Sequence, residues 1–124
     1  MSKRILVVDE QEDLRAILHG FLSASGYTVI EAVDGAESVA KAASERPDLV
    51  LMDIQLPALD GYDVTRQIKA MPGCAAVPII AVSSFAGGRR KARAAGCEHY
   101  VTKPYSPVDL LRLARRYSGE TAQH

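Results

Sequence analysis

The sequence predicts an α/β fold, a doubly wound parallel sheet of five strands flanked by five helices. Five short apolar runs alternate along the chain with segments in which apolar residues recur at helical spacing. The strand runs are almost continuously apolar, which is typical of parallel strands buried on both faces and not of a sandwich or a helix bundle. With 124 residues, of which 48% are hydrophobic, the chain fits a single domain with one sizeable core.

The first two strand and helix pairs cover residues 4–45. RILVV (4–8) predicts a strand, Glu12 and Asp13 favour a helix start, and the helix then repeats the apolar residues Leu14, Ile17, Leu18, Phe21 and Leu22 until Gly26. YTVIEA (27–32) predicts the second strand. Asp34 and Glu37 form a capping-box-like helix start, and a stripe of small residues predicts close helix packing: Ala36, Val39, Ala40 and Ala43.

The next two pairs are DLVLM (48–52) with a helix capped by Asp60, and VPIIAV (77–82) with a short helix. The first of these helices carries Val64, Ile68 and Met71 and ends at Pro72-Gly73. The second follows Gly87-Gly88 and has room for only about two turns before Gly96.

The last pair begins with EHYV (98–101), the fifth predicted strand. Ser106 is placed to cap the final helix, Pro107 suits its first position, and Asp109 supports the cap. One apolar face then follows: Leu110, Leu113, Ala114 and Tyr117.

The composition limits the location and the partners. The apolar run near the N-terminus stops at Asp9, too early for a signal peptide or a membrane span, so a cytoplasmic protein is expected. Cys74 and Cys97 have no disulfide or metal-binding spacing and are expected to be reduced. Residues 1–63 hold 12 of the 15 acids and 5 of the 15 bases. This split fits either an acidic active face opposite a basic partner-binding face or ordinary solvated helix surfaces.

Polar side chains gather at the predicted carboxyl ends of the strands, where open parallel sheets bind their ligands. Asp9 and Glu10 follow the first strand, and Asp53 follows the third. The fourth and fifth strands are followed by Ser83, Ser84, Thr102 and Lys103. Three carboxylates, a hydroxyl and an ammonium group therefore converge at one edge of the predicted sheet.

Carboxylates this close together raise one another's pKa unless a cation binds among them. Mg²⁺ is the natural candidate because it prefers oxygen ligands and keeps several waters, whereas zinc would need His or Cys ligands. A carboxylate that faces such a metal can attack phosphorus, and Asp53 suits this role best. Lys103 would then bind the oxygens of the transferring group, and Ser83 would donate a hydrogen bond to them.

Four segments occur in order with suitable gaps: ILVVDE (5–10), DLVLMDIQLPALDGYD (48–63), PIIAVSS (78–84) and YVTKPYS (100–106). Together they resemble the receiver domains of two-component response regulators, the CheY-like superfamily, and specifically a stand-alone receiver. The resemblance covers essentially the whole chain. It implies a flavodoxin-like sheet with strand order 2-1-3-4-5, a receiver domain over residues 1–119 and no effector domain. The tail over 120–124 is short and polar and is expected to fray.

The resemblance also implies roles for the strand-end residues. Asp9 and Glu10 would form the acidic pair that holds Mg²⁺, and Gln55 would add its main-chain carbonyl. Asp53 would accept a phosphoryl group from a sensor histidine kinase or a histidine phosphotransfer protein and would also contact the metal. The only chemistry of such a protein is phosphoryl uptake and slow self-dephosphorylation.

Four further residues match the part of the family pattern that carries the switch. Ser83 and Lys103 would contact the phosphoryl group, and the peptide bond before Pro104 is commonly cis in similar domains. Tyr100 matches the aromatic switch position that is coupled to the Ser83 hydroxyl. The surface formed by the fourth helix, the fifth strand and the fifth helix would change on phosphorylation and regulate a downstream protein.

Two departures from the common pattern bear on this function. The acidic pair is Asp-Glu, so Glu10 reaches further out and could bind the metal directly or through a water molecule. The span from Ser83 to Tyr100 is about two residues shorter than usual, and Gly87-Gly88 replaces a polar helix start. Since Gly-Gly is a poor helix former, the fourth helix is expected to start late and to follow a mobile loop.

Several bases near this helix predict a basic output face that docks an acidic partner: Arg89, Arg90, Lys91, Arg93, Arg112, Arg115 and Arg116. Monomers or weak dimers are expected, and a membrane or nucleic-acid role is not. A degenerate receiver that only docks proteins is the main alternative. A phosphatase would carry a second acid where Gln55 stands, and a nucleotide or flavin binder would need a phosphate loop in place of DEQED.

Overall fold

The computed structural model describes residues 2–119 and confirms the predicted α/β architecture. All strand pairs are parallel, and the sheet order is β2-β1-β3-β4-β5, as the resemblance implied. The strands are β1 (Arg4–Val8), β2 (Thr28–Ala32), β3 (Leu49–Asp53), β4 (Ile79–Ser83) and β5 (His99–Thr102). The predicted frayed tail at 120–124 lies outside the described residues.

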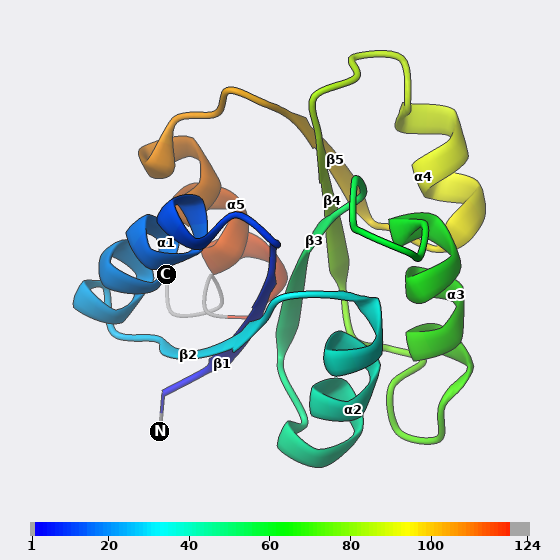
Figure 1. The fold of residues 1–124 in the computed structure, drawn as a ribbon. Coiled ribbons are helices and arrows are strands. Elements are labelled where there is room, and N and C mark those ends of the chain that lie inside the picture. The colour runs from blue at the N-terminus through cyan, green and yellow to red at the C-terminus, as the bar shows by residue number, and fades with distance from the viewer. Residues whose placement is uncertain (1, 120–124) are drawn as a thin grey trace.

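Five helices connect the strands and cover both faces of the sheet. They are α1 (Glu12–Ala24), α2 (Gly35–Glu45), α3 (Gly61–Ala70), α4 (Arg89–Ala95) and α5 (Pro107–Tyr117). Figure 1 shows α1 and α5 on one face and α2, α3 and α4 on the other. No helix within residues 2–119 is long and apolar enough to cross a membrane.

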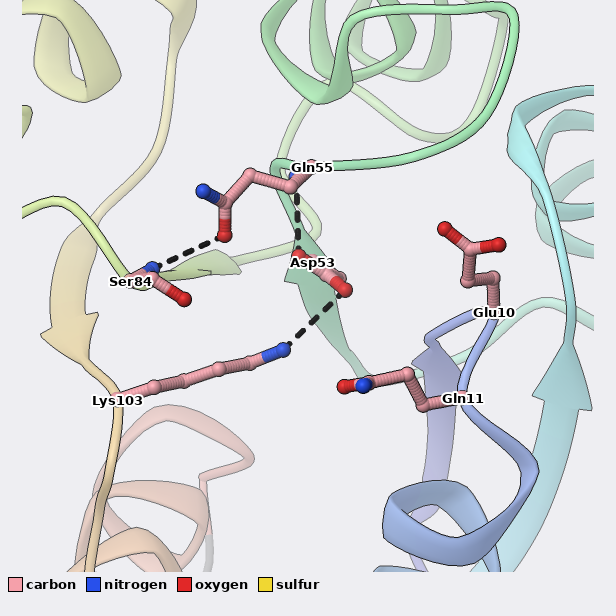
Figure 2. A pocket seen from close by; sticks show the side chains of 6 residues that line it. All are labelled: Glu10, Gln11, Asp53, Gln55, Ser84 and Lys103. Carbon is pink, nitrogen blue, oxygen red and sulfur yellow. Dashed lines mark hydrogen bonds and ion pairs between the residues drawn. The ribbon is translucent and has the colours of Figure 1, made fainter.

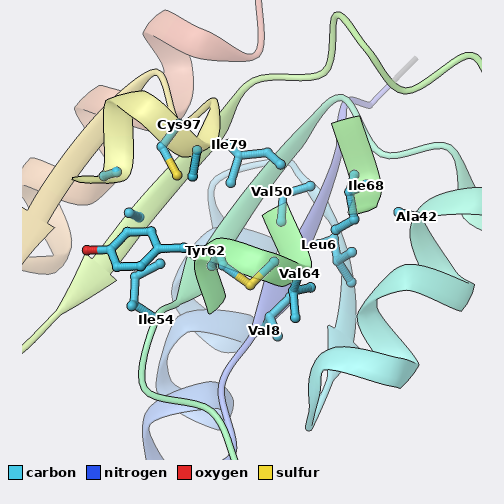
Figure 3. Close-up of a cluster of buried hydrophobic side chains, with 14 of the residues drawn as sticks. Leu6, Val8, Ala42, Val50, Ile54, Tyr62, Val64, Ile68, Ile79 and Cys97 are labelled. Carbon is cyan, nitrogen blue, oxygen red and sulfur yellow. The ribbon is translucent and has the colours of Figure 1, made fainter. Parts of the chain in front are cut away.

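Each face of the sheet has its own apolar core, because successive strand residues point to opposite sides. Leu6, Val50 and Ile79 point toward α2 and α3, where they meet Val64 and Ile68 (Figure 3). On the other face the core consists of Ile5, Val7, Leu49, Leu51 and Ile80 with side chains of α1 and α5. Burying one such side chain contributes about 1.5–3 kcal/mol, so both layers hold the strand ends firmly in register.

The predicted helix caps are present and fix the helix starts next to the strand ends. Asp34 accepts a hydrogen bond from the Glu37 amide, and Asp60 accepts one from the Tyr62 amide. Ser106 caps α5 through the Asp109 amide. These bonds satisfy amides that the helices leave unpaired, and they fix where α2, α3 and α5 begin after their strands.

Helix α4 begins directly after Gly88 and has only seven residues, which confirms the predicted late start and short length. The two glycines before it differ in their surroundings. A Cβ atom on Gly88 would lie 2.5 Å from the hydroxyl of Tyr100 and 2.7 Å from that of Tyr62. A Cβ atom on Gly87 would meet only the ring of Phe85. Gly88 is therefore required by the space between two tyrosines, a reason that propensity alone does not give.

Candidate functional site

An open cavity of about 480 Å³ lies at the carboxyl edge of the sheet, where the strand ends were predicted to converge. Figure 2 shows the side chains around it, which come from the ends of β1, β3, β4 and β5. They are Glu10, Gln11, Asp53, Gln55, Ser84 and Lys103. Four of these residues were predicted to belong to the site: Glu10, Asp53, Gln55 and Lys103. The polar residues at the predicted strand ends therefore indicated where the cavity lies.

Asp53 is the last residue of β3 and is only 4% exposed. Its Oδ1 accepts a hydrogen bond of 2.9 Å from the Gln55 amide, and its Oδ2 lies 3.3 Å from Lys103 Nζ. Burial raises the pKa of the Asp53 carboxyl above its ordinary value, although the Gln55 amide and Lys103 oppose the shift. The negative charge of Asp9 adds to the rise. The carboxylate is thus costly to keep charged and gains from any nearby cation.

Asp9 and Asp53 share one cation in the structure. Lys103 Nζ lies 3.6 Å from Asp9 Oδ2 as well as 3.3 Å from Asp53 Oδ2. Both carboxylates are buried, and Asp9 also accepts a 2.9 Å hydrogen bond from the Gln11 amide. One positive charge therefore faces two buried acids, which leaves excess negative charge at the strand ends.

Glu10 is placed differently from the other two acids. Its side chain is exposed, and in Figure 2 its carboxylate stands apart from the pair formed by Asp53 and Lys103. Within residues 2–119 no three His, Cys, Asp or Glu side chains are grouped so that they could hold a metal ion. A metal at this site would rest on fewer protein carboxylates, with other oxygens completing its shell.

The donor chemistry of the site fits Mg²⁺. Asp9 and Asp53 are close enough for one ammonium group to reach both, and the cavity beside them has room for water. Mg²⁺ is usually bound by one or two carboxylates while it keeps several waters. Every protein group at the strand ends that could coordinate it offers oxygen, the ligand atom that this ion prefers.

Ser83 is the last residue of β4 and Ser84 follows it, and the two side chains have different surroundings. Ser83 is 2% exposed, and its Oγ accepts a hydrogen bond of 3.0 Å from the Phe85 amide. Within the described residues this is its one side-chain hydrogen bond, so its own proton remains available as a donor. Ser84 lines the cavity, and its amide donates a 3.0 Å bond to Gln55 Oε1 (Figure 2).

Tyr100 points into the protein and is only 5% exposed. Its hydroxyl donates a hydrogen bond to the main-chain carbonyl of Phe85. The neighbouring Tyr62 is also buried, and its hydroxyl donates a 3.3 Å bond to the carbonyl of Gly88. Burial raises the pKa of Tyr62 to about 12, so Tyr62 remains a neutral donor to the loop between β4 and α4.

The peptide bond between Lys103 and Pro104 is cis, as the resemblance implied. Next to it, Tyr105 is half-buried beside the acids. Burial, followed by the charges of Asp9 and Asp53, raises the pKa of Tyr105 to about 12. The sequence reading did not single out Tyr105, and its position in the loop after β5 was the one available signal.

Sequence reasoning also missed a polar support behind the acidic pair. Arg15 donates a hydrogen bond of 2.8 Å from its Nη1 to the main-chain carbonyl of Asp9, and its Nε lies 2.6 Å from Glu31 Oε1. His19 contacts the other Glu31 oxygen at 2.5 Å. Arg15 stands four residues after Gln11 on α1, so helical spacing from the acidic segment could have indicated it.

Comparison with known proteins decides the family. The model of the response regulator receiver domain matches residues 5–115. The chain belongs to this family. Receiver domains are phosphoacceptors of two-component signalling, and this receiver has no membrane-spanning helix within its described residues.

Individual relatives cover nearly the whole receiver. The polar-differentiation response regulator DivK of Brucella anthropi is 36% identical over 122 residues, which is 97% of this chain and 99% of DivK. The receiver domain of the sensor histidine kinase PA1611 from Pseudomonas aeruginosa PAO1 is 35% identical with a TM-score of 0.87, over 96% of this chain and 99% of that one. Its crystal structure contains a magnesium ion coordinated in the active site cleft.

The chemotaxis response regulator CheY4 of Vibrio cholerae has the same fold with a TM-score of 0.89. It is 25% identical and covers 94% of this chain and 99% of its own. DivK and CheY4 are each matched over 99% of their length.

Proposed function

We propose that this receiver is a phosphorylation-activated switch that accepts a phosphoryl group on Asp53. The observation that carries the proposal is the contact between the buried Asp53 carboxylate and Lys103 at the wall of an open polar cavity. A carboxylate at this position can act as a nucleophile toward phosphorus and form an aspartyl phosphate. The ammonium group of Lys103 would then bind oxygens of the phosphoryl group.

The transfer exchanges one bond for another. An oxygen of Asp53 attacks the phosphorus of a phosphohistidine on a sensor histidine kinase or a histidine phosphotransfer protein. A P–O bond forms while the P–N bond breaks, and its electron pair returns to the imidazole nitrogen. Lys103 moves its hydrogen bond from Asp53 to a phosphoryl oxygen, and the Gln55 amide, which donates to Asp53 Oδ1, would help orient the group. Slow attack of water later restores the carboxylate.

Magnesium is the cofactor that we propose for this transfer. Asp9 and Asp53 would hold it, with the main-chain carbonyl of Gln55, while Glu10 would act directly or through a water molecule. When bound, the ion neutralises charge that develops on the transferring oxygens. The exposed position of Glu10 favours contact through water.

Ser83 and Tyr100 would transmit the change. The Ser83 hydroxyl has a proton to donate to the phosphoryl group, and Tyr100 is held by the same loop that Ser83 contacts. A shift of Ser83 toward the phosphoryl group would alter the space and the bonds around Tyr100. The receiver would then move between two existing states and would not adopt a new fold.

The proposed setting is cytoplasmic, with residues 1–119 acting as a receiver, as a monomer or weak dimer that regulates a protein partner. A docking module without phosphorylation is the second candidate. The observation that favours it is the exposed side chain of Glu10, which stands apart from Asp53 and Lys103 in Figure 2.

The test is incubation with Mg²⁺ and a small phosphodonor such as acetyl phosphate, beside Asp53→Asn. Intact-mass spectrometry should show one added phosphoryl group on the wild type and none on the variant. Equal incorporation in both would overturn the assignment of Asp53. No incorporation in either would favour the docking module.

A further inference from the structure

We propose that Phe85 and three arginines of α4 form one docking surface for an acidic protein segment that carries an apolar side chain. The arginines are Arg89, Arg90 and Arg93, and the four residues are called the Phe85–arginine surface below. The inference rests on the proposed function, because phosphorylation of Asp53 is what would change this surface.

The charge of the surface is uncompensated. Arg89, Arg90 and Arg93 are exposed and, with Gly87, line an open hollow of about 630 Å³. Within residues 2–119 none of the three forms an ion pair, whereas four other arginines each pair with a carboxylate: Arg4, Arg15, Arg66 and Arg112. Three unpaired guanidinium groups within two turns of one helix attract a carboxylate-rich partner, and each can bind a carboxylate through two hydrogen bonds.

The apolar part of the surface is Phe85, which is 66% exposed. Its ring rests on the loop, since a Cβ atom on Gly87 would lie 2.8 Å from Phe85 Cζ. The backbone of Gly87 thus supports one side of the ring and leaves much of the rest to solvent. Aromatic and arginine side chains are enriched among residues that dominate binding energy. Phe85 does not line the hollow itself, but it lies against Gly87, which lines the hollow together with the three arginines.

The position of Phe85 is coupled to both switch residues. Its amide donates to Ser83 Oγ at 3.0 Å, and its carbonyl accepts from the Tyr100 hydroxyl. If Ser83 turns toward a phosphoryl group on Asp53, the Phe85 amide must follow it or lose its acceptor. If Tyr100 changes position, the carbonyl loses its donor. The state of Asp53 therefore determines how the ring of Phe85 is presented beside the arginines.

The chemistry favours an acidic protein over a nucleic acid. The chain has 15 acids and 15 bases, and 12 of the acids lie in residues 1–63, which would repel a long polyanion. Single-stranded nucleic acids are usually bound along an extended basic groove with several aromatic rings, whereas this surface is compact and has one exposed ring. A short acidic segment matches its size, and an apolar side chain on that segment would cover the open side of Phe85.

The test uses a fluorescein-labelled synthetic peptide of Asp and Glu with one central Leu, titrated by fluorescence anisotropy. Mg²⁺ is present, and the protein is measured before and after treatment with acetyl phosphate. Phosphorylation should tighten binding about fivefold or more. Phe85→Ala, and the combined change of Arg89, Arg90 and Arg93 to Ala, should each weaken binding about tenfold. The same peptide with Ser in place of Leu should bind the wild type and Phe85→Ala alike.

Two matched variants control for general effects. Arg66→Ala removes an exposed arginine that is already paired with Asp63, and Ile17→Ala removes an exposed apolar side chain on α1. Both should bind the peptide as the wild type does. Weakening by Arg66→Ala as large as that by Arg89→Ala, which also removes one positive charge, would show that total charge matters and would overturn the surface.

Phosphate incorporation is measured by mass on every sample, which separates the two proposals. Normal incorporation with unchanged peptide affinity would overturn the coupling of the surface to Asp53 and leave the proposed function intact. If no phosphoryl group is incorporated, the proposed function fails, and the surface is tested by its variants alone. Equal peptide affinities of the wild type, Phe85→Ala and the arginine triple variant would then overturn the surface as well. Tighter binding of a single-stranded oligonucleotide than of the peptide would overturn the acidic protein as the occupant.

Discussion

Replacing Gly88 by alanine should destabilise the protein by forcing a methyl group between two buried tyrosines. The new Cβ atom would lie 2.5 Å from the Tyr100 hydroxyl, 2.8 Å from Tyr100 Cζ and 2.7 Å from the Tyr62 hydroxyl. Both rings are buried, at 5% and 6% exposure, and their hydroxyls donate to carbonyls of the same loop. Neither ring can therefore move aside without losing packing and a hydrogen bond.

The size of the effect follows from these contacts. Gly88 has φ −90° and ψ 3°, the values of the third residue of a type I turn, which alanine also adopts, so the cost comes mainly from packing. Overpacking of this kind costs about 1–3 kcal/mol. If Tyr100 is expelled instead, the loss of its hydrogen bond alone costs about 0.5–1.5 kcal/mol. We expect a loss of about 2 kcal/mol and a fall in Tm of roughly 5–12 °C.

Urea unfolding followed by circular dichroism measures this loss, with Gly87→Ala as the matched control. A Cβ atom on Gly87 meets only the largely exposed ring of Phe85, so this change should stay within about 0.5 kcal/mol. In a Tyr100→Ala background the cost of Gly88→Ala should shrink, because the ring it strikes is gone. Equal stability of the two alanine variants would refute the packing explanation.

Three other changes test the site and the fold. Burial raises the pKa of Asp53 in the folded protein, so the charged carboxylate lowers stability as the pH rises from its unfolded pKa through its folded pKa. Asp53→Asn should therefore raise the urea midpoint at pH 7 in EDTA, and the gain should fade toward about pH 3. A gain that does not depend on pH would contradict this. Burial raises the pKa of the Cys97 thiol to about 11, so iodoacetamide at pH 8 should alkylate it only when urea unfolds the chain. Mass spectrometry measures the alkylation, and fast alkylation of the folded protein would contradict the prediction. Asp60→Ala removes the cap of α3 and should lower the free energy of unfolding, measured in urea, by about 1 kcal/mol. Asp63→Ala breaks only the exposed ion pair with Arg66 and should change it by no more than about 0.5 kcal/mol. Similar losses in the two variants would argue against capping.

The fold could be predicted from the sequence because local signals agreed with one another. Apolar runs marked every strand, and Asp34 and Asp60 marked helix starts that the structure confirms. The strand ends were less certain: β3 and β4 reach Asp53 and Ser83, one residue beyond the predicted ends. Polar residues at a strand end look like loop in the sequence, although the ladder hydrogen bonds continue through them.

The position of the site could be predicted, but not its detailed contacts. Parallel topology places every strand end at one edge, so Asp53 and Lys103 were expected to meet. The direction of Glu10 depends on a side-chain rotamer, and the link between Arg15 and the carbonyl of Asp9 depends on how α1 packs. The confinement of Gly88 by two rings is likewise a tertiary effect, which a propensity scale cannot contain.

The distribution of aromatic residues gives the protein an optical property. It has five tyrosines and no tryptophan, so its ultraviolet emission comes from phenol rings alone. Tyr62 and Tyr100 both contact the loop around Gly88, and Tyr105 lies beside the acids of the cavity. Most of these fluorophores therefore surround the groups that would move with phosphorylation. The unlabelled protein can report its own state in a cuvette, and Tyr100→Phe would identify how much of that signal comes from the hydroxyl bound to Phe85.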